Sequence, residues 1–92
     1  MSSLMIVGAD HLGSILDKLS SFGFHDVYHV NGRKVKMVNM EIPEKVGCIL
    51  VLTDFVNHNL STEIKKRAKS QCIPIYFAKR SWCSIYKALQ GR

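Results

Sequence analysis

Two continuous apolar runs dominate the hydrophobic pattern of the chain, Leu4 to Val7 and Gly47 to Thr53. Runs of this length without polar alternation are typical of strands that are buried on both faces, as in a parallel sheet. Two more segments, Asp26 to Val30 and Pro74 to Ala78, have the composition of shorter strands. The pattern therefore predicts four strands.

Between the strands the apolar residues recur at helical spacing. Gly23 is placed to end the first of the three helices that this spacing predicts, and Ser81 is placed to cap the last one. The expected apolar faces are Leu12, Ile15, Leu16, Leu19 and Phe22 in the first helix, Leu60, Ile64, Ala68 and Cys72 in the second, and Trp82, Ile85, Tyr86 and Leu89 in the third.

Strands that alternate with helices pair in parallel through right-handed crossovers. We therefore expect an α/β fold, a three-layer α/β/α sandwich whose four-stranded parallel sheet has the order 2-1-3-4, formed by one domain over residues 1–92. The segment from Lys34 to Val46 matches neither period, and Pro43 interrupts any long regular element in it. A short helix or an irregular crossover is expected there.

The chain carries 13 Lys and Arg against 7 Asp and Glu, a net charge of +6, so its outer field attracts anions such as nucleic acids and nucleotides. We expect no membrane segment and a cytoplasmic location, because no apolar run reaches the length of a membrane span and no cationic leader is present. Three cysteines without CxxC spacing favour reduced, buried thiols.

Polar side chains follow the first and third strands directly. In the expected order these strands are neighbours, and ligands of open α/β sheets bind in the crevice at such carboxyl ends. The set Asp10, His11, Asp54 and His58 offers donors for a divalent ion such as Mn or Mg, with His11, Asp54 and His58 as catalytic candidates. Alternatively, Asp54 or Asn59 caps the following helix, and either histidine bonds a loop carbonyl.

Gly8 and Gly13 flank a tight turn from strand to helix that would expose backbone N–H groups to a phosphate, with Asp10 between them. The spacing is neither GxGxxG nor a Walker motif. An equally good interpretation is a compact turn in which Asp10 is the N-cap of the helix.

The candidate ligand-binding set also includes Asn57 after the third strand and four basic residues at the ends of the edge strands, namely Arg33, Lys34, Lys79 and Arg80. Phe55 also falls in a loop at this crevice. By contrast, Lys65, Lys66, Arg67 and Lys69 are expected to form a solvated helix face, and the helical spacing of Trp82 favours a core position over base stacking.

Two classes of function fit these residues. The first is binding of a phosphate-bearing ligand, a nucleotide or RNA, at the strand ends, with or without metal-assisted phosphodiester hydrolysis. The second is a non-catalytic regulatory or interaction module, or a histidine-based site for haem or a transition metal. The exposed edge strands also favour a homo-oligomer.

Four stretches carry a family resemblance: Gly8-Ala-Asp-His-Leu-Gly13, His29-Val-Asn-Gly-Arg-Lys34, Val51-Leu-Thr-Asp-Phe-Val-Asn-His-Asn59 and Ala78-Lys-Arg-Ser-Trp-Cys-Ser-Ile-Tyr86. Through them the whole chain resembles a family of small bacterial proteins catalogued as domain of unknown function 2325. The resemblance implies a Rossmann-like fold. It supplies no catalytic residues.

Overall fold

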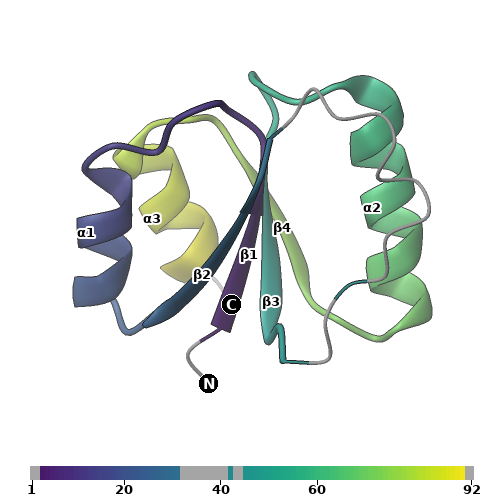
Figure 1. Ribbon diagram of the computed structural model, residues 1–92, viewed down its shortest axis with the longest axis horizontal. Helices are drawn as coiled ribbons and strands as arrows, with labels where there is room; N and C mark the ends of the chain where they lie inside the picture. Colours follow the sequence, from purple (N-terminus) through teal and green to yellow (C-terminus); the bar gives the residue numbers. More distant parts are fainter. Residues whose placement is uncertain (1–2, 32–41, 43–44, 91–92) are drawn as a thin grey trace.

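The computed structural model describes residues 3–31, 42 and 45–90 (Figure 1). The expectation for Lys34 to Val46 falls mostly outside these residues. In the described part of the chain, no helix has the length and apolarity needed to cross a membrane. The elements are, in chain order, β1 (Ser3–Val7), α1 (Ile15–Ser21), β2 (Asp26–Val30), β3 (Cys48–Leu52), α2 (His58–Ser70), β4 (Ile75–Ala78) and α3 (Trp82–Gln90).

The four strands form one sheet in the order β2-β1-β3-β4, and every neighbouring pair is parallel. Ile6 of β1 lies opposite His29 of β2 on one side and Leu50 of β3 on the other. The predicted fold class and strand order are therefore confirmed. The carboxyl ends of β1 and β3 lie side by side, as the crevice hypothesis requires.

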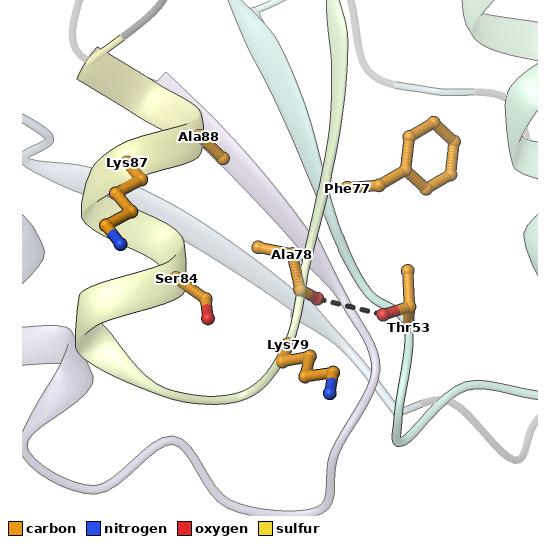
Figure 2. Close-up of a pocket in the computed structure, with 7 residues that line it drawn as sticks. All are labelled: Thr53, Phe77, Ala78, Lys79, Ser84, Lys87 and Ala88. Carbon is orange, nitrogen blue, oxygen red and sulfur yellow. Dashed lines mark hydrogen bonds between the residues drawn. The ribbon is translucent and has the colours of Figure 1, made fainter.

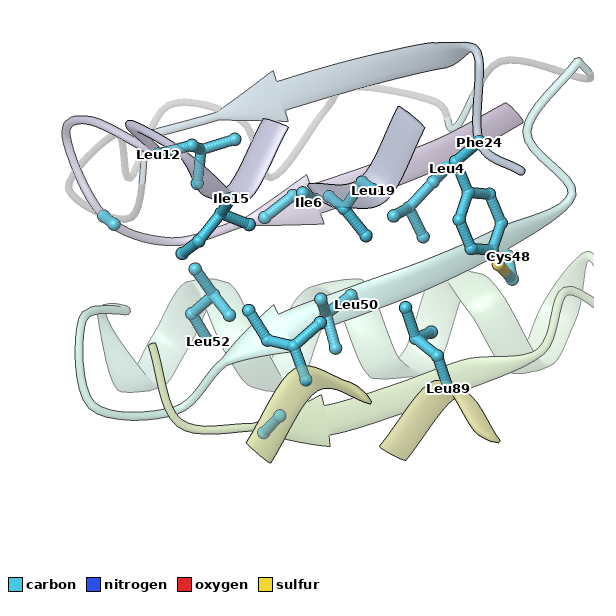
Figure 3. Packing of buried hydrophobic residues seen from close by; sticks show 13 residues of the cluster. Leu4, Ile6, Leu12, Ile15, Leu19, Phe24, Cys48, Leu50, Leu52 and Leu89 are labelled. Atoms are coloured by element: carbon cyan, nitrogen blue, oxygen red, sulfur yellow. The ribbon is translucent and has the colours of Figure 1, made fainter. Parts of the chain in front are cut away.

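Two apolar clusters hold the helices against opposite faces of the sheet. Figure 1 shows α1 and α3 over one face and α2 over the other. Leu4 and Ile6 of β1 pack with Leu19 of α1 and Leu89 of α3 (Figure 3), while the alternate residues Met5 and Val7 pack with α2. Because strand side chains alternate between faces, a continuous apolar run supplies both clusters. Each fully buried aliphatic side chain contributes roughly 1.5–3 kcal/mol to folding.

Helix α1 is shorter than its apolar spacing predicts. It begins at Ile15, and Ser14 occupies the N-cap position without a side-chain cap bond. Leu12 is buried against the core from the preceding turn. Asp10 is not the cap, which corrects one of the two interpretations of this turn, because Asp10 lies four residues before Ser14 and its Oδ1 accepts a hydrogen bond from Asn31 Nδ2 at 2.7 Å.

Both α1 and α2 end in a Schellman motif. After α1, Gly23 has φ +109° and donates to the Ser20 carbonyl at 3.1 Å, and Phe24 donates to Leu19 at 3.0 Å. This confirms Gly23 as the stop residue.

The second motif places Cys72 where a glycine is usual. Cys72 has φ +58° and donates to the Lys69 carbonyl at 3.3 Å, and Ile73 donates to Ala68 at 2.8 Å. The predicted role of Cys72 on the apolar face of α2 is wrong, because the helix ends at Ser70 and the thiol is exposed. Cys83 is exposed as well, so of the three cysteines Cys48 alone fits the expectation of buried thiols.

Replacing Cys72 with glycine is expected to stabilise the fold. A non-glycine residue in the left-handed region costs about 1 kcal/mol, so Cys72→Gly should raise the free energy of unfolding by about that amount, measured by urea denaturation. Cys72→Ala keeps the strain and should give no gain. Cys83→Gly places a glycine inside α3 and should cost about 1 kcal/mol. Equal effects of the two glycine substitutions would contradict this account.

Gly8 is required by the close approach of β1 to β3. Its φ is +123°, and a Cβ there would lie 3.0 Å from both Leu52 Cβ and the Leu52 carbonyl oxygen. Gly23 also has positive φ, but a Cβ added there meets nothing within 4 Å. A substitution at Gly23 would therefore add backbone strain alone, whereas one at Gly8 would add both strain and a close contact.

We expect Gly8→Ala to cost roughly 3 kcal/mol of unfolding free energy, because collision with the Leu52 backbone adds to the strain of positive φ. Gly23→Ala should cost about 1 kcal/mol, from strain alone. Chemical denaturation of both variants checks the difference. Equal losses would show that the approach at Gly8 is not a constraint.

Candidate functional site at the carboxyl ends of the strands

The chain leaves β1 through a strained turn fastened to both neighbouring strands. Gly8 N–H donates to the Val30 carbonyl at the end of β2 (2.8 Å), and Ala9 N–H donates to the Phe55 carbonyl after β3 (2.9 Å). Ala9 is buried and has φ +64°, a conformation that costs energy for any residue with a Cβ. The amides of Gly8 and Ala9 are therefore engaged within the protein, so the predicted phosphate cradle does not have the Gly8 N–H to offer.

His29 of β2 supports this turn from the other side. Its Nε2 lies 2.8 Å from the Gly8 carbonyl oxygen and 2.9 Å from the Ala9 carbonyl oxygen. Both partners are acceptors, so Nε2 carries a hydrogen and donates. The position of His29 in a strand gave no sequence signal for this contact, since it depends on β1 and β2 being neighbours.

Arg80 ties together three loops at the strand ends. Its side chain donates to the His11 carbonyl oxygen from Nε (3.0 Å) and from Nη2 (2.6 Å). Its backbone N–H donates to Asp54 Oδ1 at 2.9 Å. The loops after β1, β3 and β4 are thus joined through one residue, and the guanidinium is held in a fixed direction.

A hollow of about 280 Å³ opens beside this guanidinium. Its lining residues are Ala9, Asp10, His11, Phe55 and Arg80. Phe55 is 55% exposed, the largest fraction among the exposed large apolar residues of the described part of the chain. Asp10 and His11 from one loop thus meet Phe55 and Arg80 from two others, so three loops that are remote in sequence border one hollow.

The predicted divalent metal centre is not formed. Within residues 3–31, 42 and 45–90, no three His, Cys, Asp or Glu side chains lie close enough to hold a metal ion. The physical reason lies in the hydrogen bonds already made: Asp54 accepts from the Arg80 backbone and Asp10 accepts from Asn31. His58 starts α2 and is not among the residues that line the hollow. Asp10, His11, Asp54 and His58 are therefore not gathered into one ligand set in this structure.

Asn57 is the N-cap of α2. Its side-chain oxygen accepts from the backbone N–H of Asn59 (2.9 Å) and of Leu60 (3.3 Å). The alternatives that Asp54 or Asn59 caps this helix are wrong, and the proposed ligand-binding residue Asn57 has its oxygen engaged in the helix start.

The remaining predicted residues lie in several places. Arg33 and Lys34 fall outside the described residues. Gly13 lies beside the site, since a Cβ there would be 4.0 Å from Arg80 Nη2. Lys79 lines a separate hollow between β4 and α3.

Two further expectations concern residues outside the site. Trp82 is half-buried and packs edge-on against Phe22, with ring centroids 6.2 Å apart, so it lies at the margin of the core and not within it. On α2, Arg67 pairs with Glu63 at 3.1 Å, while Lys65, Lys66 and Lys69 are exposed, as expected for a solvated face.

Comparison with family models gives one match over residues 3–91, to the family described as an uncharacterized protein conserved in bacteria, DUF2325. The chain belongs to this family. Neither a curated protein nor a solved structure matches it.

Substitutions at Asn57 test whether this residue stabilises the start of α2. Asn57→Ala should lower the free energy of unfolding of the DUF2325 protein by about 1 kcal/mol, while Asn57→Asp should retain it, because a carboxylate oxygen also accepts from these N–H groups. Asn59→Ala, two residues on, should change stability by less than about 0.5 kcal/mol. Thermal and urea unfolding measure all three. A stable Asn57→Ala variant would contradict the cap assignment.

Proposed function

We propose that the hollow at the carboxyl ends of β1, β3 and β4 binds the phosphate group of a nucleotide, either free or as one nucleotide of an RNA. The observation that carries this proposal is the guanidinium of Arg80, fixed by two hydrogen bonds to the His11 carbonyl at the wall of the hollow. A cation whose orientation is set before binding loses less entropy when an anion arrives.

The free hydrogen-bonding capacity of Arg80 supports this role. Nε and Nη2 point at the His11 carbonyl, and within the described residues Nη1 has no protein partner. Guanidinium N–H groups form strong, charge-assisted bonds with phosphate oxygens. His11 lines the same hollow, and its imidazole offers a second hydrogen-bond donor for a phosphate. The net charge of +6 attracts anionic ligands to the molecule as a whole.

Phe55 supports a ligand that carries a planar group as well as a phosphate. Phe55 lines the hollow and is 55% exposed, so part of this residue is open to contact with a ligand. Stacking of a nucleobase on an aromatic ring is worth about 1–3 kcal/mol. The volume of about 280 Å³ is at the small end of ligand sites, which favours one nucleotide over a dinucleotide.

The same geometry favours binding over hydrolysis. A metal-dependent mechanism through His11, Asp54 and His58 needs these groups around one reacting phosphate. Asp54 instead accepts from the Arg80 backbone, and His58 lies outside the lining of the hollow. We therefore propose a binding module, in which hydrolysis plays no part.

Calorimetry with adenosine monophosphate tests this function. The wild-type protein should bind the nucleotide more tightly than adenosine, in buffer with or without EDTA, and with an affinity that falls as salt increases. Arg80→Gln should weaken binding roughly tenfold or more, the loss expected for a charge-assisted phosphate contact. Lys66→Gln, which removes the same charge from an exposed position on α2, should change affinity little.

Two more variants keep the test independent of the structural bonds of Arg80. His11→Ala retains the carbonyl that holds Arg80 and should weaken nucleotide and inorganic phosphate alike. Phe55→Ala should weaken the nucleotide but not inorganic phosphate. Equal affinity for adenosine and its monophosphate would overturn the proposal. Turnover of labelled RNA that is lost in His58→Ala would replace binding with catalysis.

A further inference from the structure

Strand β4 lies at one end of the sheet. Within the described residues β4 pairs with β3 alone. The carbonyls of Pro74 and Ala78 accept from Ile49 and Thr53 of the β3 side, so alternate residues of β4 face inward. The N–H and carbonyl groups of Ile75 and Phe77 therefore point outward from the sheet. Such an edge is a template for one more strand.

A shallow groove of about 690 Å³, wide open to solvent, lies beside this edge between β4 and α3. Figure 2 shows Ser84 and Lys87 projecting from α3 on one side of β4, while the Phe77 ring points away from α3. The lining residues are Thr53, Phe77, Ala78, Lys79, Ser84, Lys87 and Ala88. A strand added beside β4 would set alternate side chains over this groove, with the others beside Phe77 on the opposite face.

The positive charge of the groove favours a partner strand with acidic side chains. Two of its lining residues, Lys79 and Lys87, are exposed cations, and no lining residue is acidic. We propose that β4 binds an extended acidic segment of a partner protein by strand addition, with carboxylates of the segment facing Lys79 and Lys87. Backbone hydrogen bonds to Ile75 and Phe77 give the affinity, and the lysines select the sequence.

A second copy of this chain fits the edge less well. Pairing of β4 with β4 would bring the lysines of two grooves together on molecules that each carry a net charge of +6. Like charges across an interface oppose association. The inference does not depend on nucleotide binding, because the hollow beside Arg80 lies at the strand ends and has none of these lining residues.

Fluorescence anisotropy with labelled synthetic peptides tests the inference. A peptide of alternating Glu and Val should bind the wild-type protein, and its Lys and Val counterpart should not. Phe77→Pro removes one outward N–H and leaves the bonds to β3 in place, so it should weaken binding roughly tenfold. Phe77→Ala keeps the N–H and should retain most of the affinity. Val27→Pro, at an outward position of the other edge strand, β2, should have no effect on binding.

Charge reversal gives an independent readout. The double variant Lys79→Glu with Lys87→Glu should no longer bind the Glu peptide and should bind the Lys peptide instead. The control variant Lys65→Glu with Lys66→Glu makes the same change of net charge on α2 and should leave the binding of both peptides unchanged. Equal losses in the two double variants would reduce the binding to general electrostatics and overturn the proposal. Binding that survives Phe77→Pro would overturn strand addition. A wild-type dimer in sedimentation that Phe77→Pro dissociates would assign this edge to self-pairing instead.

Discussion

The close approach of β1 and β3 at Gly8 is the constraint on which the strand-end site depends. A Cβ at Gly8 would lie 3.0 Å from the Leu52 carbonyl oxygen, which is tighter than an ordinary contact, and φ of +123° is a conformation that glycine adopts without penalty. With Gly8 in place, the chain turns sharply and Ala9 N–H reaches the Phe55 carbonyl. That bond draws the loops after β1 and β3 together and creates one wall of the hollow.

Arg80 completes the site by joining a third loop to the first two. Its contacts with His11 and Asp54 span 69 and 26 positions of sequence. Backbone groups supply half of this network: the His11 carbonyl and the Arg80 N–H. The Asp54 carboxylate, which looks like a reactive group in sequence, here fixes the loop that carries Arg80. Polar residues after a strand can thus build a site without touching what the site binds.

The fold could be predicted from the sequence because its signals are local and repeated. Continuous apolar runs at Leu4–Val7 and Cys48–Leu52 require burial on both faces, and alternation with helical segments leaves few topologies. The residues at which helices begin and end were harder to predict from the sequence. Cys72 has the spacing of an apolar face but lies beyond the end of α2 at Ser70, because the terminating Schellman motif accommodates a cysteine where glycine is usual.

The sequence indicates which residues follow the strands but not the hydrogen-bond partners of their side chains. The sequence indicates that Asp10, His11 and Arg80 lie at the strand ends, and they do line one hollow. The sequence does not indicate which way each side chain points. Whether the Asp54 carboxylate faces a ligand or the Arg80 N–H depends on distances of a few ångströms between loops that are remote in sequence. The supporting contact of His29 with Gly8 and Ala9 is likewise visible once β1 and β2 are paired.

The order β2-β1-β3-β4 also has a consequence for how the polypeptide is made. Strand β1 is central, yet its second neighbour, β3, belongs to the other half of the chain, so one side of β1 stays uncovered while the ribosome produces the intervening residues. During synthesis the apolar edge of β1 that pairs with β3 is therefore exposed, and the core cannot form from the amino-terminal half alone. Folding of this small protein awaits the emergence of the residues up to Leu52 and of the helices that follow.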